Sequence, residues 1–272
     1  MSRWMISAEQ LQALTTDEVV IIDCRFSLQD SDAGESLYSR GHIPGAHYLH
    51  LERDLSGQKG MHGGRHPLPP IDLLATKLGE MGVGPDTLVV AYDDGSLGFA
   101  ARLWWLLRYL GHDKVKLLDG GIKAWREAGF GTDDQAAVAQ AKNFVADVRH
   151  DMVVDINTVK TIPLLPSAVL IDSRDRARFL GQQEPIDPIA GHINGAKNYP
   201  WSELTNDQMI LLSEQQQRER WGSVLEQEDI VCYCGSGVSA CVNLLSLAET
   251  GREDAQLYVG SWSDWCSYLT LK

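Results

Sequence analysis

The fold is decided by a segment that the chain contains twice. Val20-Ile21-Ile22-Asp23-Cys24-Arg25 returns as Val169-Leu170-Ile171-Asp172-Ser173-Arg174. Three more pairs of segments match in the same order: residues 41–46 with 191–196, 89–93 with 230–234, and 119–125 with 259–265. The offset between partners is about 150 residues at first and about 140 later, far longer than a solenoid repeat. The pattern therefore indicates a duplicated domain.

Within each copy, strand and helix patterns alternate. Runs rich in β-branched and other apolar residues predict buried parallel strands at 19–22, 88–92 and 115–118. Helical patterns cover 100–110 and 122–128, and a glycine follows each of them. The alternation predicts an α/β fold in which each copy is a mostly parallel sheet with helices on both faces.

The two copies are expected to meet where the core signal is weak. Residues 131–143 contain Gly-Thr-Asp-Asp followed by a stretch rich in Ala and Gln. We therefore expect one domain at 1–135 and a second at 150–272. Ligands of open α/β sheets bind beyond the carboxyl ends of the strands, so chemistry is expected there.

Composition excludes several classes of partner. The chain has 272 residues with 24 Lys and Arg against 37 Asp and Glu, a formal charge of −13. Such an acidic surface repels nucleic acid and anionic lipid. The densest apolar run, 103–107, lies between two arginines and is far too short to span a membrane. With five cysteines and no apparent signal peptide, we expect a cytoplasmic protein with reduced thiols.

One strand end stands out because it carries a cysteine. Residues 230–240 read Ile-Val-Cys-Tyr-Cys-Gly-Ser-Gly-Val-Ser-Ala, with the strand ending at Cys234 and a helix predicted from about 239 to 250. The glycines let loop N–H groups point inward, and the helix N-terminus adds its positive end. A cysteine in this cradle is expected to act as a thiolate nucleophile. The alternative is an inert buried cysteine.

The other cysteines suggest no further site. Cys24, Cys241 and Cys266 are interpreted as core or incidental residues, and the role of Cys232, one pleat away from Cys234, stays open. Cysteine pairs with the two-residue spacing of zinc sites are lacking in the sequence, so we expect neither a metal nor a cofactor.

Taken together, the repeats, the Asp-x-Arg and Gly-His-Ile-x-Gly-Ala segments and the cysteine loop resemble the two-domain rhodanese family over nearly the whole chain. The loop is most similar to the mercaptopyruvate sulfurtransferase branch. The resemblance implies two tandem rhodanese-like domains and a transferase that holds a sulfane sulfur as a persulfide on Cys234. Asp93 stands at the corresponding place in the first copy. Since a carboxylate cannot form a persulfide, the first domain is expected to be inert.

The resemblance also implies roles for residues around the cysteine. Arg178 matches an arginine that contacts an anionic sulfur donor, together with the loop residues Gly235, Gly237, Val238 and Ser239. Ser236 and His66 match a catalytic serine and histidine, with Glu52 or Asp54 as the accompanying acid. Such a relay would deliver a proton to the leaving enolate.

One feature leaves the donor open. The mercaptopyruvate branch carries a second arginine after Glu-Pro, but residues 184–188 read Glu-Pro-Ile-Asp-Pro. The loop in turn lacks the Arg-Lys that thiosulfate enzymes place after the cysteine. The expected function is transfer of sulfur from 3-mercaptopyruvate to a thiol, a thioredoxin-like protein or cyanide; the alternative donor is thiosulfate.

Residues shared by both copies are expected to be structural. Asp172 and Arg174 should form an ion pair, and His42 and His192 recur even though the first copy is inert. Two other classes of function fit the cysteine loop less well. A cysteine-dependent phosphatase needs an arginine six positions after the cysteine, where this chain has Ala240. A non-catalytic binding module would not need to retain Cys234.

Overall fold

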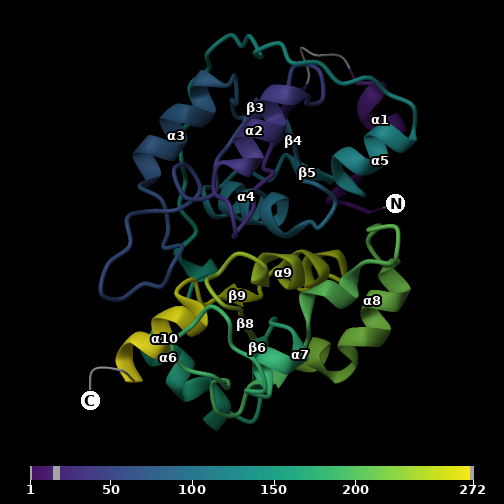
Figure 1. Cartoon of the computed structure of the whole chain (residues 1–272). Helices are drawn as coiled ribbons and strands as arrows, with labels where there is room; N and C mark the ends of the chain where they lie inside the picture. Colours follow the sequence, from purple (N-terminus) through teal and green to yellow (C-terminus); the bar gives the residue numbers. More distant parts are fainter. Residues whose placement is uncertain (1, 15–18, 270–272) are drawn as a thin grey trace. The chain divides into compact units, whose positions relative to one another are not determined.

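The computed structural model describes residues 2–14 and 19–269, which contacts divide into two units (Figure 1). Unit 1 consists of Met1–Gly57, Leu68–Arg149 and Asp207–Leu211. Unit 2 consists of Gln58–Pro67, His150–Asn206 and Leu212–Lys272. Two short segments, 58–67 and 207–211, thus belong to the unit that does not hold their neighbours in sequence.

Unit 1 is a parallel sheet with helices on both faces. Its strands are β1 (Met5–Ile6), β2 (Val19–Asp23), β3 (His47–Tyr48), β4 (Leu88–Tyr92) and β5 (Val115–Leu118), in the order β1-β5-β4-β2-β3. Its helices are α1 (Ala8–Gln12), α2 (Ala33–Arg40), α3 (Ile71–Glu80), α4 (Gly98–Tyr109) and α5 (Gly121–Glu127). Helix α4 lies on one face of the sheet, and α1 and α5 lie on the other (Figure 1).

Unit 2 repeats this plan. Its sheet contains β6 (Ala168–Asp172), β7 (Lys197–Asn198), β8 (Asp229–Tyr233) and β9 (Gln256–Leu257), in the order β7-β6-β8-β9. Its α-helices are α6 (Ile156–Thr161), α7 (Arg176–Phe179), α8 (Glu214–Trp221), α9 (Ala240–Glu249) and α10 (Ser261–Leu269). Short 3₁₀ helices cover His150–Met152, Ile162–Leu164, Trp201–Leu204 and Gly222–Glu226. All strand pairings named in both sheets are parallel, which confirms the predicted α/β fold.

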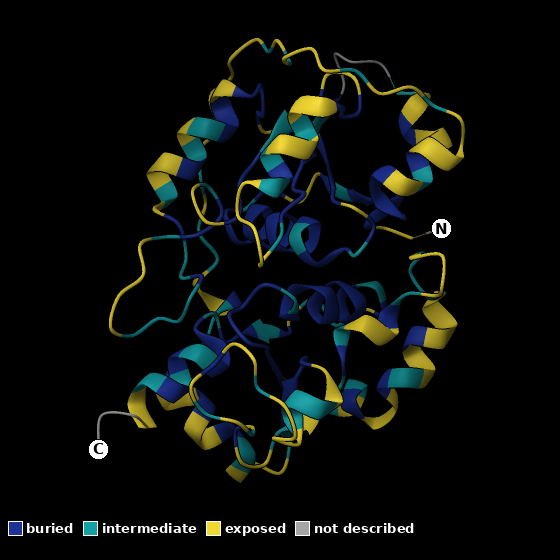
Figure 2. Cartoon of the chain, viewed as in Figure 1, coloured by how far each residue is buried: buried dark blue, intermediate teal, exposed yellow. Residues whose placement is uncertain are grey.

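Each sheet is enclosed by apolar side chains. In unit 1, the core on the face of α1 and α5 includes Leu11, Val90 and Trp125. In unit 2, the core beneath α6 and α10 includes Val159 and Trp262. Helix α9 is buried along its length and is dark blue in Figure 2. Burial of both sheet faces explains why the strands read as continuous apolar runs and not as alternating ones.

The repeated sequence segments meet in the same way in each unit. Arg25 and Arg174 each donate from Nη2 to an aspartate oxygen at 2.6 Å, from Asp23 and Asp172 respectively. The same nitrogens reach the carbonyls of Gly41 at 2.9 Å and Gly191 at 2.7 Å. The predicted ion pair between Asp172 and Arg174 is therefore confirmed. In unit 1 the corresponding pair, Asp23 with Arg25, is bonded in the same way to the carbonyl of Gly41.

The two shared histidines also have structural contacts. His42 Nδ1 lies 2.8 Å from the Tyr38 carbonyl, and its ring stacks on Tyr38. His192 Nδ1 lies 2.8 Å from the Phe179 carbonyl, and its ring stacks on Phe179. Both histidines thus connect a Gly-His-Ile segment to the preceding helix, as their recurrence suggested.

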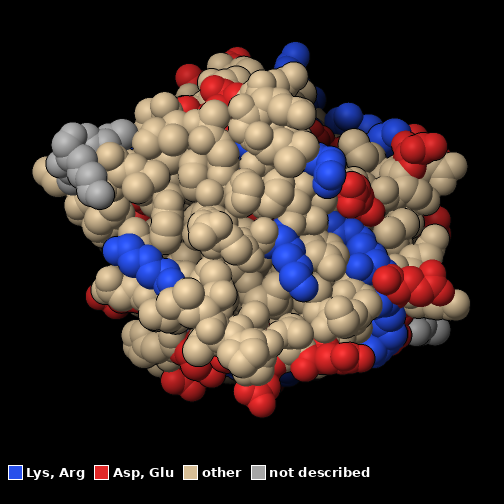
Figure 3. Space-filling model, turned by 90° about the horizontal axis from the view of Figure 1, so that it is seen from below, with Lys and Arg blue, Asp and Glu red and all other residues tan. Residues whose placement is uncertain are grey.

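Two properties bear on which partners the protein can meet: the charges on its surface and the character of its helices. On the face shown in Figure 3, acidic and basic side chains are interspersed among uncharged ones. Among the described helices, none combines the length and the apolar character that crossing a membrane requires.

Candidate active site

The candidate nucleophile follows directly on a strand. Cys234 comes after the last residue of β8, and only five residues separate it from α9. Its backbone N–H donates to Ser261 Oγ at 3.1 Å, and its carbonyl accepts from the Trp262 N–H at 3.0 Å. Ser261 and Trp262 both belong to segment 259–265, which repeats segment 119–125 of the first copy. The duplicated segment therefore fixes the backbone of the cysteine.

The sulfur lies within a tightly turned loop. The Gly237 N–H donates to Cys234 Sγ at 3.2 Å. Gly237 has φ +78°, and a Cβ there would lie 2.3 Å from the Val259 carbonyl oxygen, so the position requires glycine. Four of the five predicted donor-binding residues lie between the cysteine and α9: Gly235, Gly237, Val238 and Ser239. Their contact with a donor remains a prediction.

A serine and a histidine from distant parts of the sequence meet in this loop. Ser236 Oγ and His66 Nδ1 lie 2.7 Å apart, and both residues are buried. His66 belongs to the segment 58–67, which the contacts group with unit 2. The structure therefore brings together Cys234, Ser236 and His66 within one unit.

The segment that carries His66 is anchored to the start of α10. The Gly63 N–H donates to Asp264 Oδ1 at 2.7 Å, and the Arg65 N–H donates to Ser263 Oγ at 3.1 Å. Gly64 has φ +80°, and a Cβ there would lie 2.4 Å from the Gly260 carbonyl oxygen. Only glycine permits this close approach, which in turn sets the position of His66.

The two acids suggested as partners of His66 lie in unit 1. Asp54 forms an ion pair with Lys77 and accepts the His50 N–H at 2.7 Å. The Glu52 side chain is exposed, and the backbone N–H of Glu52 donates to His50 Nδ1 at 3.1 Å. Neither acid is grouped with the segment that holds His66.

Arg178 lies beside the loop and is surrounded by acids. A Cβ on Gly235 would lie 3.5 Å from both Nη1 and Nη2 of Arg178. Arg178 donates from Nη2 to Glu184 at 2.7 Å and to Asp187 at 2.9 Å. Although burial opposes ionisation of Glu184, hydrogen bonds from Arg178 lower the pKa of this carboxyl. The Arg178 guanidinium thus lies beside the cysteine loop, and its contact with a donor remains a prediction.

A second arginine beside the loop was not predicted. A Cβ on Gly235 would lie 2.9 Å from Arg65 Nη2, and Arg65 forms an ion pair with Asp187. Two features of the sequence could have indicated it. Arg65 directly precedes His66, and the acid Asp187 stands close to the position at which the mercaptopyruvate branch has its second arginine. Burial raises the pKa of Asp187, while the charges of Arg65 and Arg178 oppose that rise.

The corresponding loop of unit 1 contains its own anion. Asp93 accepts the N–H groups of Gly95, Leu97, Phe99 and Ala100 at 2.9–3.3 Å. Burial raises the pKa of Asp93 to about 6, together with the charge of Asp94 and against these backbone donors. The carboxylate therefore fills the cradle in which a sulfur would otherwise lie.

The remaining thiols differ from Cys234 in their surroundings. All five cysteines are free. Burial raises the pKa of Cys24 and Cys232, and it raises that of Cys266 to about 11. Cys241 lies in α9 with its Sγ 3.5 Å from the Gly237 carbonyl. Cys24, Cys241 and Cys266 are buried in the core, which fits the expectation for these three residues.

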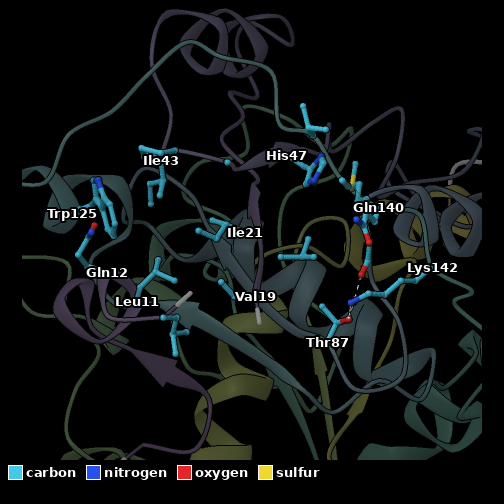
Figure 4. A pocket seen from close by; sticks show the side chains of 18 residues that line it. Leu11, Gln12, Val19, Ile21, Ile43, His47, Thr87, Trp125, Gln140 and Lys142 are labelled. Atoms are coloured by element: carbon cyan, nitrogen blue, oxygen red, sulfur yellow. Dashed lines mark hydrogen bonds between the residues drawn. The ribbon is translucent and has the colours of Figure 1, made fainter. Parts of the chain in front are cut away.

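Unit 1 also contains a hollow of about 830 Å³, and none of the predicted site residues lines it (Figure 4). Ile21, Ile43 and Trp125 line it, with Gln140 and Lys142 from the segment after α5. Lys142 Nζ donates to Thr87 Oγ1 at 3.0 Å across this side. No cysteine is among its lining residues. Among the described residues, no cluster of His, Cys, Asp and Glu is suited to hold a metal ion.

Comparison with known proteins identifies the same duplication. Residues 7–128 and 158–268 each match the rhodanese-like domain. The chain is 41% identical over 271 residues to a Pseudomonas aeruginosa protein named "Probable 3-mercaptopyruvate sulfurtransferase", covering 97% of this chain and 95% of that one. It is 36% identical over 277 residues to the Mycobacterium tuberculosis "Putative thiosulfate sulfurtransferase SseB", covering 97% and 94%.

A solved structure agrees in fold over the same extent. The crystal structure of the 3-mercaptopyruvate enzyme SseA from Escherichia coli matches this chain with a TM-score of 0.82 and 32% identity. The match covers 96% of this chain and 99% of that one.

Proposed function

Because this chain belongs to the rhodanese family of sulfurtransferases, we propose that it moves a sulfane sulfur from 3-mercaptopyruvate to an acceptor through a persulfide on Cys234. The observation that best supports this proposal is the loop after β8, where the Gly237 N–H donates to Cys234 Sγ and Ser236 contacts His66. The acceptor is a thiol, a thioredoxin-like protein or cyanide. Asp93 in the other copy supports a single reacting site.

The first half-reaction forms the persulfide. The Cys234 thiolate attacks the sulfur of 3-mercaptopyruvate, forming an S–S bond while the C–S bond breaks. The electron pair of the broken bond goes to carbon, which leaves as the enolate of pyruvate. The Ser236 hydroxyl supplies a proton to this enolate and is reprotonated through His66, with which it shares a 2.7 Å hydrogen bond. The Gly237 N–H stabilises negative charge on the sulfur.

The second half-reaction returns the enzyme. A thiolate or cyanide attacks the outer sulfur, the S–S bond breaks, and its electron pair returns to Cys234 as thiolate. The two half-reactions give a ping-pong cycle. Arg178 would hold the anionic donor close to the loop.

Substitution of the cysteine tests this proposal. We expect Cys234→Ser to abolish transfer and Cys232→Ser, one pleat away in β8, to leave it nearly unchanged. Mass spectrometry of the donor-treated protein should find one added sulfur atom on the peptide containing residue 234. Near-normal turnover by Cys234→Ser would overturn the persulfide mechanism, whereas a wild-type protein without transfer activity would favour the non-catalytic binding module.

Thiosulfate is the second candidate donor, supported by the name of the Mycobacterium tuberculosis relative and by the absence of an arginine at 186–188. We expect a kcat/KM preference of at least about tenfold, or about 1.4 kcal/mol, for 3-mercaptopyruvate when both donors are assayed side by side. The opposite preference would make thiosulfate the donor and remove the role of Ser236 and His66.

A cytoplasmic location is proposed on the state of the thiols. All five cysteines are free, as expected in a reducing compartment. Cell fractionation with antibody detection tests this location, and recovery outside the cytoplasm would contradict it.

A further inference from the structure

Asp187 stands between the two arginines that face the cysteine loop. One of its oxygens pairs with Arg65 Nη1, and the other accepts from Arg178 Nη2 at 2.9 Å. Its side chain is 1% exposed, whereas those of Arg65 and Arg178 are 26% and 15% exposed. The acid is therefore buried beneath two partly accessible guanidinium groups.

Both guanidinium groups reach the same point of the loop. A Cβ on Gly235 would lie 2.9 Å from Arg65 and 3.5 Å from Arg178. Gly235 is the residue next to Cys234, so an anion held by both arginines would lie beside the sulfur. Without Asp187, mutual repulsion would separate the two cations, because like charges at this range disfavour one another.

The acids also set the net charge of this group. Glu184 accepts from Arg178 at 2.7 Å and from Arg174 at 3.2 Å, so it adds a second carboxylate. Because Arg174 is itself paired with Asp172, the charges of Arg65 and Arg178 are balanced by Asp187 and Glu184. A balanced pair can hydrogen-bond one carboxylate bidentately, but it offers little surplus charge for a dianion.

Resting on the proposed function, we propose that Asp187 determines donor specificity by joining Arg65 and Arg178 into a site for a singly charged carboxylate. A 2-oxo acid such as 3-mercaptopyruvate carries one negative charge on its carboxylate, whereas thiosulfate carries two. Asp187 acts through the arginines and is a positioning residue. Arg65 is a donor-binding residue.

The decisive variant is Asp187→Asn. Asparagine keeps an oxygen that accepts from one guanidinium, while the site gains one positive charge. We expect the ratio of kcat/KM for thiosulfate to that for 3-mercaptopyruvate to rise about tenfold. Asp187→Glu retains the charge and should keep the wild-type ratio.

Asp229→Asn is the matched control. Asp229 is exposed at the first residue of β8, the strand whose other end leads to Cys234. Its substitution makes the same change of net charge away from the loop, so the donor ratio should stay at the wild-type value. An equal loss for both donors in Asp187→Asn would indicate a merely structural ion pair and overturn the inference.

Arg65→Gln provides a second route should Asp187→Asn fold poorly. We expect KM for 3-mercaptopyruvate to rise about tenfold while kcat changes by less than about threefold, because the lost contact is to the donor carboxylate. An unchanged KM would contradict the role of Arg65.

Binding without turnover separates this inference from the proposed function. In the Cys234→Ser background, calorimetry would compare pyruvate, a monoanion, with sulfate, a dianion. Adding Asp187→Asn should tighten sulfate binding relative to pyruvate about tenfold. Inactivity of the wild type with both donors would refute the proposed function alone, whereas unchanged relative binding would refute the inference alone.

Discussion

At the scale of single residues, Cys234 and Asp93 hold equivalent places after β8 and β4 and differ in what they present to the loop. Cys234 presents a sulfur that accepts one loop N–H at 3.2 Å. Asp93 presents a carboxylate that accepts four N–H groups. The loop of unit 2 thus holds a thiol, whereas the loop of unit 1 is filled by a carboxylate.

Ser236 should matter only when the leaving group must be protonated on carbon. We expect Ser236→Ala to lower kcat with 3-mercaptopyruvate about 100-fold, a usual size for a lost proton donor. With thiosulfate the leaving group is sulfite, a stable anion, so the change should be much smaller. Steady-state kinetics with both donors measure the difference.

His66→Gln should reproduce this pattern because His66 acts through Ser236. The double variant should lose little more than either single one, since the two residues share one hydrogen bond. Additive losses, or equal losses for both donors, would show that they do not form a relay.

At the scale of elements, both units place the corresponding loop between a strand and a long helix. Asp93 lies between β4 and α4, and Cys234 lies between β8 and α9. The predicted strands at 88–92 and 115–118 agree with β4 and β5, and the helix predicted at 100–110 agrees with α4 within two residues. These elements could be predicted because buried parallel strands are continuous apolar runs and because glycine ends the helix.

The buried carboxyl of Asp93 makes the stability of unit 1 pH-dependent. Burial raises its pKa from 3.8 to about 6, so between these values the folded chain binds a proton that the unfolded chain has lost. Its contribution to the free energy of unfolding should therefore fall as pH rises from about 4 to 6, by up to about 3 kcal/mol, and then stay level.

Denaturant unfolding of the wild type and Asp93→Asn across this pH range measures that contribution. Asparagine does not titrate, so the difference between the two proteins isolates the carboxyl. A difference that stays constant, or that grows in favour of the wild type with rising pH, would contradict the assigned direction.

At the scale of the whole molecule, one arrangement is built twice: an Asp-x-Arg ion pair bonded to the carbonyl of a Gly-His-Ile segment. Both pairs are nearly completely buried. Removing one partner of such a pair leaves an uncompensated charge in the core, which costs about 3–5 kcal/mol.

Arg25→Met and Arg174→Met should therefore both lower the free energy of unfolding by about 3–5 kcal/mol. Arg174→Met should in addition raise the donor KM, because Arg174 also holds Glu184, which contacts Arg178. Thermal or denaturant unfolding and steady-state kinetics test both statements. Arg176→Met, at an exposed position two residues away, is the control and should change neither quantity.

The sequence by itself determined the duplication, the α/β class and the cysteine loop, because each depends on local patterns: apolar runs, glycine positions and repeated segments. It also indicated Arg178, Ser236 and His66, although only by resemblance. What it could not determine was which distant residues meet. The 2.7 Å contact of His66 with Ser236 joins positions 170 residues apart.

Only the tertiary structure decided that Arg65 lies beside the cysteine loop and pairs there with Asp187. They are 122 residues apart in sequence, and the local signals that each residue carries do not show that the two meet. Their meeting depends on how segment 58–67 is anchored through Gly63 and Arg65 to the start of α10. Such long-range pairing results from packing of the whole unit, whereas strands, helices and loops result from residues that are close in sequence.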